Sequence, residues 1–412
     1  MLKAAFYETD ITPRLYECMP GQFEARYAPT ILDHLYAHAL ALENGDEKVI
    51  VISLDCIVIE KRDVLKIRRR IFDVTGVRNV MVHAIHNHTG GPVADLYASE
   101  RDDRYCEDLV MHAADAGIMA WQKRVPAKMG WATKEVFGLS FNRRYLFKDG
   151  HVDMNPGVNN PEVVRGVDII DPTLTVLRVD YEDGTPMGVV MNFPLHLDST
   201  YVKPQGFSAD YPGIVREDLL REYGANFGFL NMTGCCGNIN HLDVTGKVKN
   251  IYTDIGHALA GHIAELYDAI ESTDDLPLRF ATQEIEATIE RPTQEMVDKA
   301  PAGPRRREVE GARDLPGGTV MCEVQSIGIG EFALVGLPGE VFTRFGMDIK
   351  RRSPFGCTMV AELCNAANGY IKTRAAADEG GYEATPSTYN ILDRNAGYLM
   401  ADAAVDNLIK IH

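Results

Sequence analysis

The chain has 412 residues, of which 45% are hydrophobic and 25% charged, as in an ordinary globular protein with a substantial core. Its formal net charge of −17 disfavours nucleic acid and anionic membranes as partners. No run approaches the roughly 20 apolar residues of a membrane helix. Glu8 and Asp10 also interrupt the N-terminal apolar stretch too early for a signal peptide. We therefore expect a cytoplasmic protein, without any sequence indication of its oligomeric state.

Strand and helix patterns alternate in the first third of the chain. The β-branched run 48–55 predicts a buried strand, apolar spacing predicts a surface helix over 61–72, and 80–85 predicts another strand. Strand, helix and strand within about forty residues form a βαβ unit, which predicts a parallel strand pair. A second helix is predicted over 103–123, and a further strand over 128–140.

The rest of the chain continues the mixed pattern. The stretch 174–193 predicts a β-hairpin, 251–271 an amphipathic helix, and 331–337 a buried strand. The charged stretch 294–317, rich in Arg, Glu, Pro and Gly, is expected to be a surface insert or lid. Because no linker or repeat is evident, we expect one α/β domain that spans residues 1–412.

Two histidines follow the strand predicted over 80–85. His86 and His88 lead into Thr89-Gly90-Gly91-Pro92, which is typical of a tight turn. Loops at strand ends often carry the chemistry of α/β proteins, because the sheet holds them in place. Alternate residues of extended chain point the same way, so both imidazoles could share a metal, or one could bind it while the other transfers a proton. An isolated His-x-His pair is nevertheless more often structural.

His196 and Glu340 occupy the same context, since each follows an apolar strand at a turn. Nitrogen and carboxylate ligands with an open position are the usual composition of a catalytic zinc site. Such a site lowers the pKa of bound water and polarises a carbonyl group. The alternative for Glu340 is an acidic residue that faces the dipole of the following helix.

The order of these motifs resembles the catalytic domain of the neutral (non-lysosomal) ceramidases and their bacterial relatives. Ile85 to Pro92 is similar to the family's Ser-His-Thr-His-Ser-Gly-Pro, and Asn142-Arg143 to its Asn-Arg-Ser-Pro. Each match is weak alone, but six in the family's order, over nearly the whole chain, are fairly specific. The other matches are Asp10-Ile11-Thr12-Pro13, Asn192-Phe193-Pro194-Leu195-His196, Pro338-Gly339-Glu340, and the tyrosine block Asn368-Gly369-Tyr370-Ile371-Lys372-Thr373 with Tyr382-Glu383-Ala384.

The resemblance implies a fold of layered mixed β-sheets flanked by helices. It implies that His88 lies beside a metal and serves the proton or the substrate. It also implies that Arg143 stabilises the developing oxyanion, a dominant effect in acyl transfer, and that Tyr382 lines the substrate side. The metal that it implies is a zinc ion bound by His86, His196, Glu340 and Tyr370.

The chain departs from the family in two respects. The ceramidases carry a serine in Gly-Asp-Val-Ser-Pro-Asn at the metal, whereas Gly237-Asn238-Ile239-Asn240-His241 places Asn240 there. Because an amide is no nucleophile, we expect direct attack by metal-activated water, which Asn240 could orient. Cys235 and Cys236 have no evident neighbouring base and are expected to be buried. The family's C-terminal immunoglobulin-like domain and a secretion signal are also missing, which argues against a secreted enzyme acting on membrane ceramide.

The sequence thus predicts a zinc-dependent hydrolase that cleaves an amide, or alternatively an ester, in a small soluble N-acyl-type substrate. One alternative is an amidohydrolase barrel, which also uses His-x-His after an early strand. It would need a bridging lysine and two later histidines, and would leave Glu340 and Tyr370 incidental. The other is a metal-binding or ligand-binding protein that has lost catalysis, as the missing serine permits.

Overall fold

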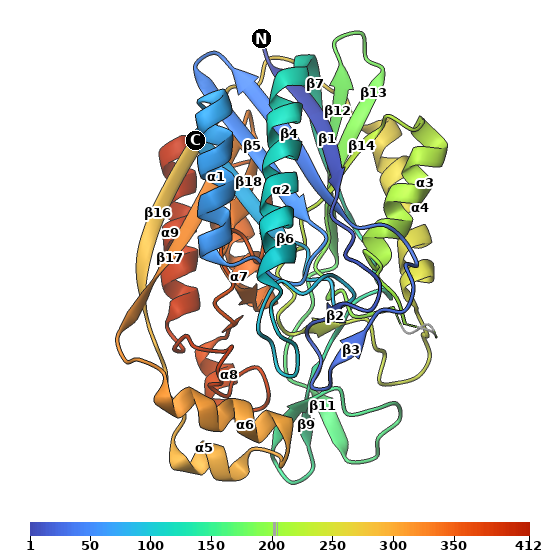
Figure 1. Ribbon diagram of the computed structural model, residues 1–412. Coiled ribbons are helices and arrows are strands. Elements are labelled where there is room, and N and C mark those ends of the chain that lie inside the picture. Colours follow the sequence, from blue (N-terminus) through green and yellow to red (C-terminus); the bar gives the residue numbers. More distant parts are fainter. Residues whose placement is uncertain (201–202, 204) are drawn as a thin grey trace.

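Two β-sheets pack face to face at the centre of the molecule, and helices cover their outer faces (Figure 1). The structure is a computed structural model that describes residues 1–200, 203 and 205–412. The larger sheet has eight strands and is mainly antiparallel, with one parallel pair at each edge. In spatial order these strands are β14 (Gly228–Asn231), β13 (Pro186–Asn192), β12 (Thr173–Tyr181), β7 (Val125–Glu135), β1 (Lys3–Asp10), β4 (Tyr36–Asn44), β5 (Glu47–Leu54) and β6 (Asn79–Ala84).

The smaller sheet has four strands and covers one face of the larger sheet. Its last two strands are parallel and the others antiparallel. Apolar side chains of both sheets meet in one buried cluster, which includes Leu40 and Leu177 of the larger sheet and Phe332 and Met359 of the smaller one. In spatial order its strands are β16 (Leu278–Thr288), β17 (Thr319–Ile329), β18 (Phe332–Gly336) and β20 (Cys357–Ala361).

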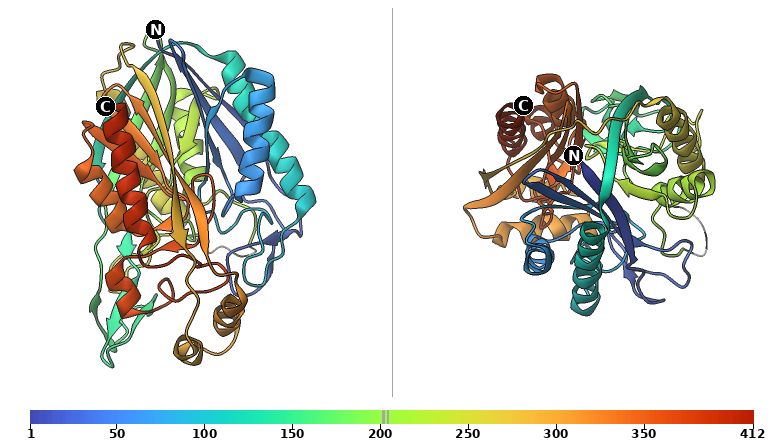
Figure 2. Two further views of the ribbon diagram at one scale, coloured as in Figure 1. Left: turned by 90° about the vertical axis from the view of Figure 1, so that its left-hand side faces the viewer. Right: turned by 90° about the horizontal axis from the view of Figure 1, so that it is seen from above.

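Six long helices form the two outer layers, which Figure 2 shows from the side and from above. Over the larger sheet, one pair contacts β1, β4 and β5, and the other contacts β7 and β12. The third pair packs on β16, β17 and β20 of the smaller sheet. The three pairs are α1 (Lys61–Thr75) with α2 (Asp103–Lys123), α3 (Tyr211–Tyr223) with α4 (Tyr252–Ala269), and α7 (Thr343–Arg352) with α9 (Ala396–Ile411).

Short elements gather at the end of the sheets that lies opposite the two chain termini (Figure 1). The polypeptide there crosses between the sheets, and isolated bridges join Asn87 to Leu197 and Gly234 to Ala361. These elements are β2 (Cys18–Met19), β3 (Arg26–Tyr27), β8 (Phe141–Asn142), β9 (Arg144–Phe147), β10 (Val152–Met154), β11 (Val163–Gly166), β15 (Ile239–Asn240), β19 (Glu340–Val341), β21 (Tyr370–Ile371), α5 (Gln294–Lys299), α6 (Pro304–Gly311), a 3-10 turn (Ala312–Asp314) and α8 (Arg374–Glu379).

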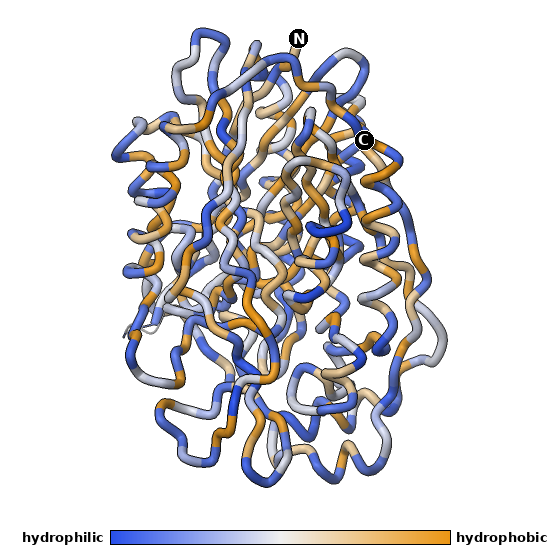
Figure 3. The backbone as a smooth tube through the Cα atoms, turned by 180° about the vertical axis from the view of Figure 1, so that it is seen from behind, coloured by the Kyte–Doolittle hydropathy of each residue, from blue (hydrophilic) through white to orange (hydrophobic). Residues whose placement is uncertain are grey.

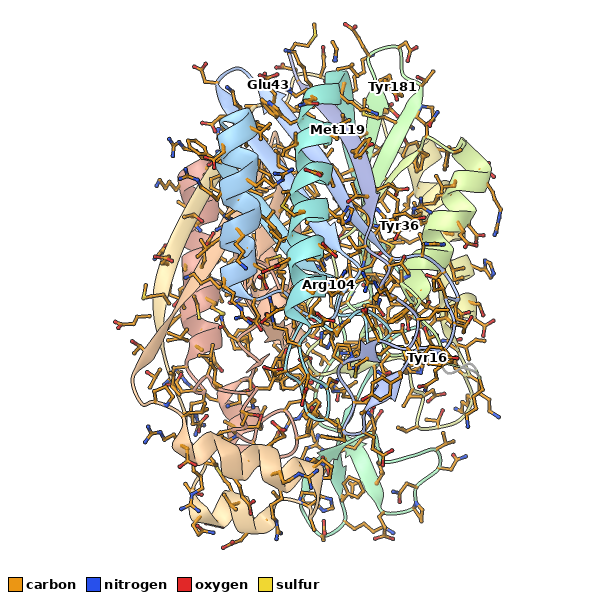
Figure 4. All side chains as sticks on the ribbon, in the orientation of Figure 1. Tyr16, Tyr36, Glu43, Arg104, Met119 and Tyr181 are labelled. Carbon is orange, nitrogen blue, oxygen red and sulfur yellow. The ribbon has the colours of Figure 1, made fainter. Side chains whose placement is uncertain are left out.

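Hydropathy follows this layering. Hydrophobic segments run along the central strands, whereas the loops at the periphery are largely hydrophilic (Figure 3). Side chains fill the space between the layers (Figure 4). Within the described part of the chain, no helix combines the length and the apolar character needed to cross a lipid bilayer.

The structure confirms the predicted α/β fold of layered mixed sheets flanked by helices. β5, α1 and β6 form the expected βαβ unit with a parallel pair, and β12 and β13 form the expected hairpin. The strand predicted over 128–140 ends at Glu135, where the chain leaves the sheet. Both large sheets are open, so the strands of the described residues form no closed barrel, and the amidohydrolase-barrel alternative is wrong.

Candidate metal centre

A turn after β6 brings the first two histidines together. The chain leaves the sheet at Ala84, and the backbone N–H groups of His86 and Asn87 donate to the carbonyl oxygen of Cys56. His86 has a φ of 68°, a left-handed conformation that a non-glycine residue rarely adopts. The expected alternation along extended chain is therefore wrong at this residue, and a strained turn aims its ring instead. Such strain persists where surrounding contacts impose it, often at functional sites.

Three histidine rings converge at this point. The Nε2 atom of His88 lies 3.3 Å from Nε2 of His86 and 3.0 Å from Nε2 of His196, and all three side chains are buried. Each ring offers one nitrogen to this point, and the three nitrogens all lie within 4.8 Å of one another. Imidazole nitrogens that converge in this way form a donor set suited to a metal ion.

The third and fourth predicted ligands lie on neighbouring short strands. β19 and β21 pair in parallel, with Glu340 opposite Tyr370, and the Glu340 N–H donates to the carbonyl oxygen of Gly369. The Glu340 carboxylate reaches the histidines, with Oε2 at 3.2 Å from Nε2 of His86. The structure thus brings His86, His196 and Glu340 together and places Tyr370 beside Glu340; the ligand set itself stays a prediction.

Burial and nearby charges set the protonation of these groups. Burial, followed by the charge of His86, lowers the pKa of His88 and His196 well below the usual range, so both rings are neutral. Burial also disfavours charge on His86 and Glu340, but each charge stabilises the other, which raises the His86 pKa and lowers the Glu340 pKa. Neutral imidazoles and an ionised carboxylate are the forms that bind a metal, so a metal at this centre would have to displace the proton that Glu340 favours on His86.

One buried polar atom in this cluster, Nδ1 of His88, has no hydrogen-bond partner among the described residues. An unpaired buried polar atom is costly, and such atoms usually mark a site that an ion or water completes. The converging Nε2 atoms and the Glu340 carboxylate fit a metal ion.

Arg143 lies between β8 and β9, and its side chain points toward the histidines. Its Nε donates to Oε1 of Glu383 at 2.6 Å, and its Nη1 lies 3.5 Å from Nδ1 of His196. The guanidinium carbon is 5.3 Å from the ring centre of Tyr370. Nη2 is buried without a hydrogen-bond partner among the described residues, so it remains a donor for another group. The sequence offered no reason to single out Glu383 as the partner of this arginine.

The two other predicted catalytic residues lie in different surroundings. The Tyr382 ring packs edge-on against Tyr370, with 5.6 Å between centroids, and its hydroxyl meets that of Tyr97. Asn240 is buried, and its Nδ2 donates to Oδ1 of Asn155 at 3.2 Å. Its Oδ1 accepts the His241 N–H at 2.6 Å, so loop contacts already use both ends of this amide. A role of Asn240 in orienting water stays a prediction.

The adjacent cysteines are buried, as expected, and burial followed by the Glu362 charge raises their pKa well above the usual range. Glu362 itself was not predicted to have a role. Its carboxylate accepts the N–H groups of Cys236 at 3.0 Å and Val341 at 2.8 Å. It therefore ties the cysteine-containing loop to the strand that carries Glu340, and an acid at the end of a buried strand was its only sequence signal.

A cavity of about 850 Å³ approaches this centre through Tyr382, although none of the four predicted metal ligands lines it. Phe23, Tyr97 and Tyr382 line it, and Tyr382 also contacts Tyr370. The charged insert predicted over 294–317 forms α5 and α6, and both helices contribute to the cavity wall. The insert therefore forms part of the cavity wall, and its role as a lid stays a prediction.

Sequence comparisons give no relative: no family model matches the chain, and no curated protein sequence matches it. Solved structures do share its fold. One is described as neutral ceramidase from Pseudomonas aeruginosa, with a TM-score of 0.77 and 18% identity over 100% of this chain and 75% of that chain. Another is described as ceramidase complexed with C2, with the same TM-score and identity over 99% and 75%. The predicted resemblance to the ceramidase catalytic domain is confirmed at the level of the fold.

Proposed function

We propose that this protein is a zinc-dependent hydrolase that cleaves the amide bond of a small soluble N-acyl-type substrate with metal-activated water. The observation that carries the proposal is the buried convergence of His86, His88 and His196 with Glu340, beside a cavity of about 850 Å³. The shared fold with neutral ceramidase supports hydrolysis of an amide.

The proposed ligands are two imidazoles, a carboxylate and a phenol. Zinc prefers nitrogen and oxygen donors of this kind, and a catalytic site leaves a further position open. A zinc ion bound there would lower the pKa of water and polarise the substrate carbonyl. Burial and the Glu340 charge raise the pKa of the Tyr370 phenol in the protein alone, and a nearby cation would oppose this effect. The ligands in this proposal are His86, His196, Glu340 and Tyr370.

The other side chains supply positioning and proton transfer. The Nη2 amino group of Arg143 has no hydrogen-bond partner among the described residues. It could therefore donate a hydrogen bond to the substrate carbonyl oxygen, and the positive charge of the guanidinium would stabilise the negative charge that develops there. Glu383 holds that guanidinium in place through the 2.6 Å contact to Nε. The neutral ring of His88 would accept a proton from the attacking water and return it to the leaving nitrogen. Tyr382 would contact the substrate from the cavity side.

A second candidate is a metal-binding homologue without catalysis. It is favoured by Asn240, which replaces the family's serine and whose amide is already engaged by Asn155 and the His241 N–H. A hydrolase that uses water directly needs no serine, which is why we prefer the first candidate. Esters of the same acyl groups would separate amide from ester specificity.

We also propose a cytoplasmic location. All eight cysteines are free, and most are buried. Free thiols are the usual state in a reducing compartment.

The proposal is tested by metal analysis and turnover on one preparation. We expect one zinc per chain and hydrolysis of at least one member of a panel of N-acyl amines. His196→Ala should lose both zinc and turnover, whereas His257→Ala, at an exposed histidine of α4, should retain both. One zinc per chain without turnover on any amide or ester would favour the binding protein. A chain that binds no zinc would refute both candidates.

A further inference from the structure

The cavity beside the metal centre has an aromatic wall. The ring centroid of Phe23 lies 4.8 Å from that of Tyr97 and 5.9 Å from that of Tyr382, and all three residues line the cavity. Aromatic faces attract cations through their negative π-electron density. The Arg305 guanidinium already lies 5.1 Å from the ring centre of Tyr382, so this wall does accommodate a positive group.

Ion pairs neutralise most charges that line the cavity. In each pair one positive side chain neutralises one carboxylate, so the pairs add little net charge to the cavity. The pairs are Arg305 with Asp153 at 3.1 Å, Lys299 with Glu295 at 2.7 Å, Arg394 with Asp378 at 2.8 Å, and Arg144 with Glu379 at 3.2 Å.

Glu308 of α6 differs from these carboxylates. It is half-buried, lines the cavity and accepts a hydrogen bond from the Thr388 hydroxyl, but forms no ion pair with any described residue. Burial raises its pKa. Burial and the contact with Tyr382 raise the pKa of Tyr97 most, and the charges of Glu340 and Glu308 add smaller effects, so Tyr97 lies within the electrostatic reach of both carboxylates. Glu308 is therefore a cavity-lining acid without an ion-pair partner among the described residues, and only the charge of the neighbouring Arg307 partly offsets its own.

We propose that this cavity binds a positively charged group of the ammonium type, with Glu308 as its counter-ion and Phe23, Tyr97 and Tyr382 as its aromatic wall. Resting on the proposed function, this inference names the substrate class as an N-acyl compound that carries a cation. A half-buried carboxylate is stabilised by a bound cation, because the ion pair offsets its lost hydration. The net charge of −17 also raises the local concentration of cations around the protein.

Binding without turnover gives the first test. The zinc-loaded protein is titrated calorimetrically with hexyltrimethylammonium, which cannot ligate a metal, and with hexanol, which carries no charge. We expect wild-type protein to bind the cation about tenfold more tightly than the alcohol. Glu308→Gln should abolish this preference, and Glu310→Gln, an exposed position on the same helix, should retain it. Equal binding of the two probes, or a preference that survives Glu308→Gln, would overturn the inference.

Turnover gives the second test and separates this inference from the proposed function. Two isosteric amides are compared, N-hexanoyl-butanediamine with a terminal ammonium and N-pentylhexanamide with a terminal methyl. We expect Glu308→Gln to lower the ratio of their kcat/KM values about tenfold. An unchanged ratio would contradict the inference although hydrolysis occurs. Cation binding that depends on Glu308, with no hydrolysis of either amide or of any member of the N-acyl panel, would uphold the cation site and contradict the hydrolase.

Discussion

At the scale of single residues, the centre depends on nitrogen and oxygen atoms that come from distant parts of the chain. The sequence singled out His86, His196 and Glu340, because each follows an apolar strand and matches a family motif, and the structure brings the three together. Their mutual distances could not be predicted, since they depend on packing between two sheets. The left-handed turn at His86 and the partners Glu383 and Glu362 also had no local signal, because long-range contacts impose them.

Arg143→Lys tests the proposed oxyanion donor. Lysine keeps the positive charge but loses the fork that contacts Glu383 while leaving Nη2 free. We expect kcat to fall by roughly 10²–10³-fold, the usual effect of removing one such donor. Zinc content, measured on the same sample, should be unchanged. Arg165→Lys, on the exposed strand β11, is the matched control and should keep full activity. A kcat within threefold of wild type for Arg143→Lys would rule out the assigned role.

At the scale of secondary-structure elements, one charge network with His38 and Asp55 buried at its centre joins β1, β4, β5 and α3. Glu8 of β1 is the register partner of His38 of β4, and their side chains approach to 3.2 Å. Asp55, directly after β5, lies 3.5 Å from the other ring nitrogen of His38. Arg216 of α3 pairs with Glu8 and lies 4.4 Å from the ring centre of Tyr36, which is labelled in Figure 4.

This network predicts how stability changes with pH. Burial opposes charge on His38, but Asp55 and Glu8 outweigh it and raise its pKa from 6.5 to about 9. The contribution of protonated His38 to the free energy of unfolding is therefore complete below pH 6.5 and is lost as the pH rises through 9. Burial would raise the Glu8 pKa, but His38 and Arg216 lower it from 4.5 to about 2, so that its contribution is lost as pH falls through 2.

His38→Gln should therefore destabilise the protein more at mildly acidic than at alkaline pH. We expect its cost in free energy of unfolding to be up to about 3 kcal/mol larger near pH 6 than above pH 9. Urea denaturation at both pH values measures this difference. His112→Gln, at an exposed position of α2, should change stability by less than about 0.5 kcal/mol at either pH. A cost for His38→Gln that does not vary with pH would contradict the assignment.

Most elements with strong periodicity could be predicted from sequence alone. The βαβ unit of β5, α1 and β6 and the β12–β13 hairpin have local patterns that packing only reinforces. The helices α5 and α6 were missed within the charged insert, because short helices there lack a regular apolar stripe. The strand β7 ends at Glu135 rather than at Ser140, because its pairing with β12 stops at Thr173, which no local pattern indicates.

At the scale of the whole molecule, stability depends on the core between the two sheets. Phe332 of β18 is fully buried there, and its ring lies 5.8 Å from that of Trp131 on the facing sheet. The order of strands in the two sheets involves crossovers between distant segments, so the sequence alone predicted layers only through the family resemblance. Composition and periodicity restricted the fold to the α/β class.

Phe332→Ala tests the importance of that core. Removing a fully buried ring leaves a cavity and loses burial, which should cost about 3–5 kcal/mol of the free energy of unfolding. Phe137→Ala, at a ring that is 66% exposed, should cost no more than about 0.5 kcal/mol. Denaturant unfolding of both variants gives the comparison. Equal costs for the two would show that the sheets do not depend on this contact.

The metal assignment is tested most directly by a crystal structure of the zinc-loaded protein with anomalous diffraction measured at the zinc edge. We predict one strong anomalous peak, with bonds of about 2.0–2.3 Å to His86, His196, Glu340 and Tyr370. A map without a peak among these side chains, or a zinc ion held by the three histidines while Glu340 and Tyr370 point away, would contradict the account.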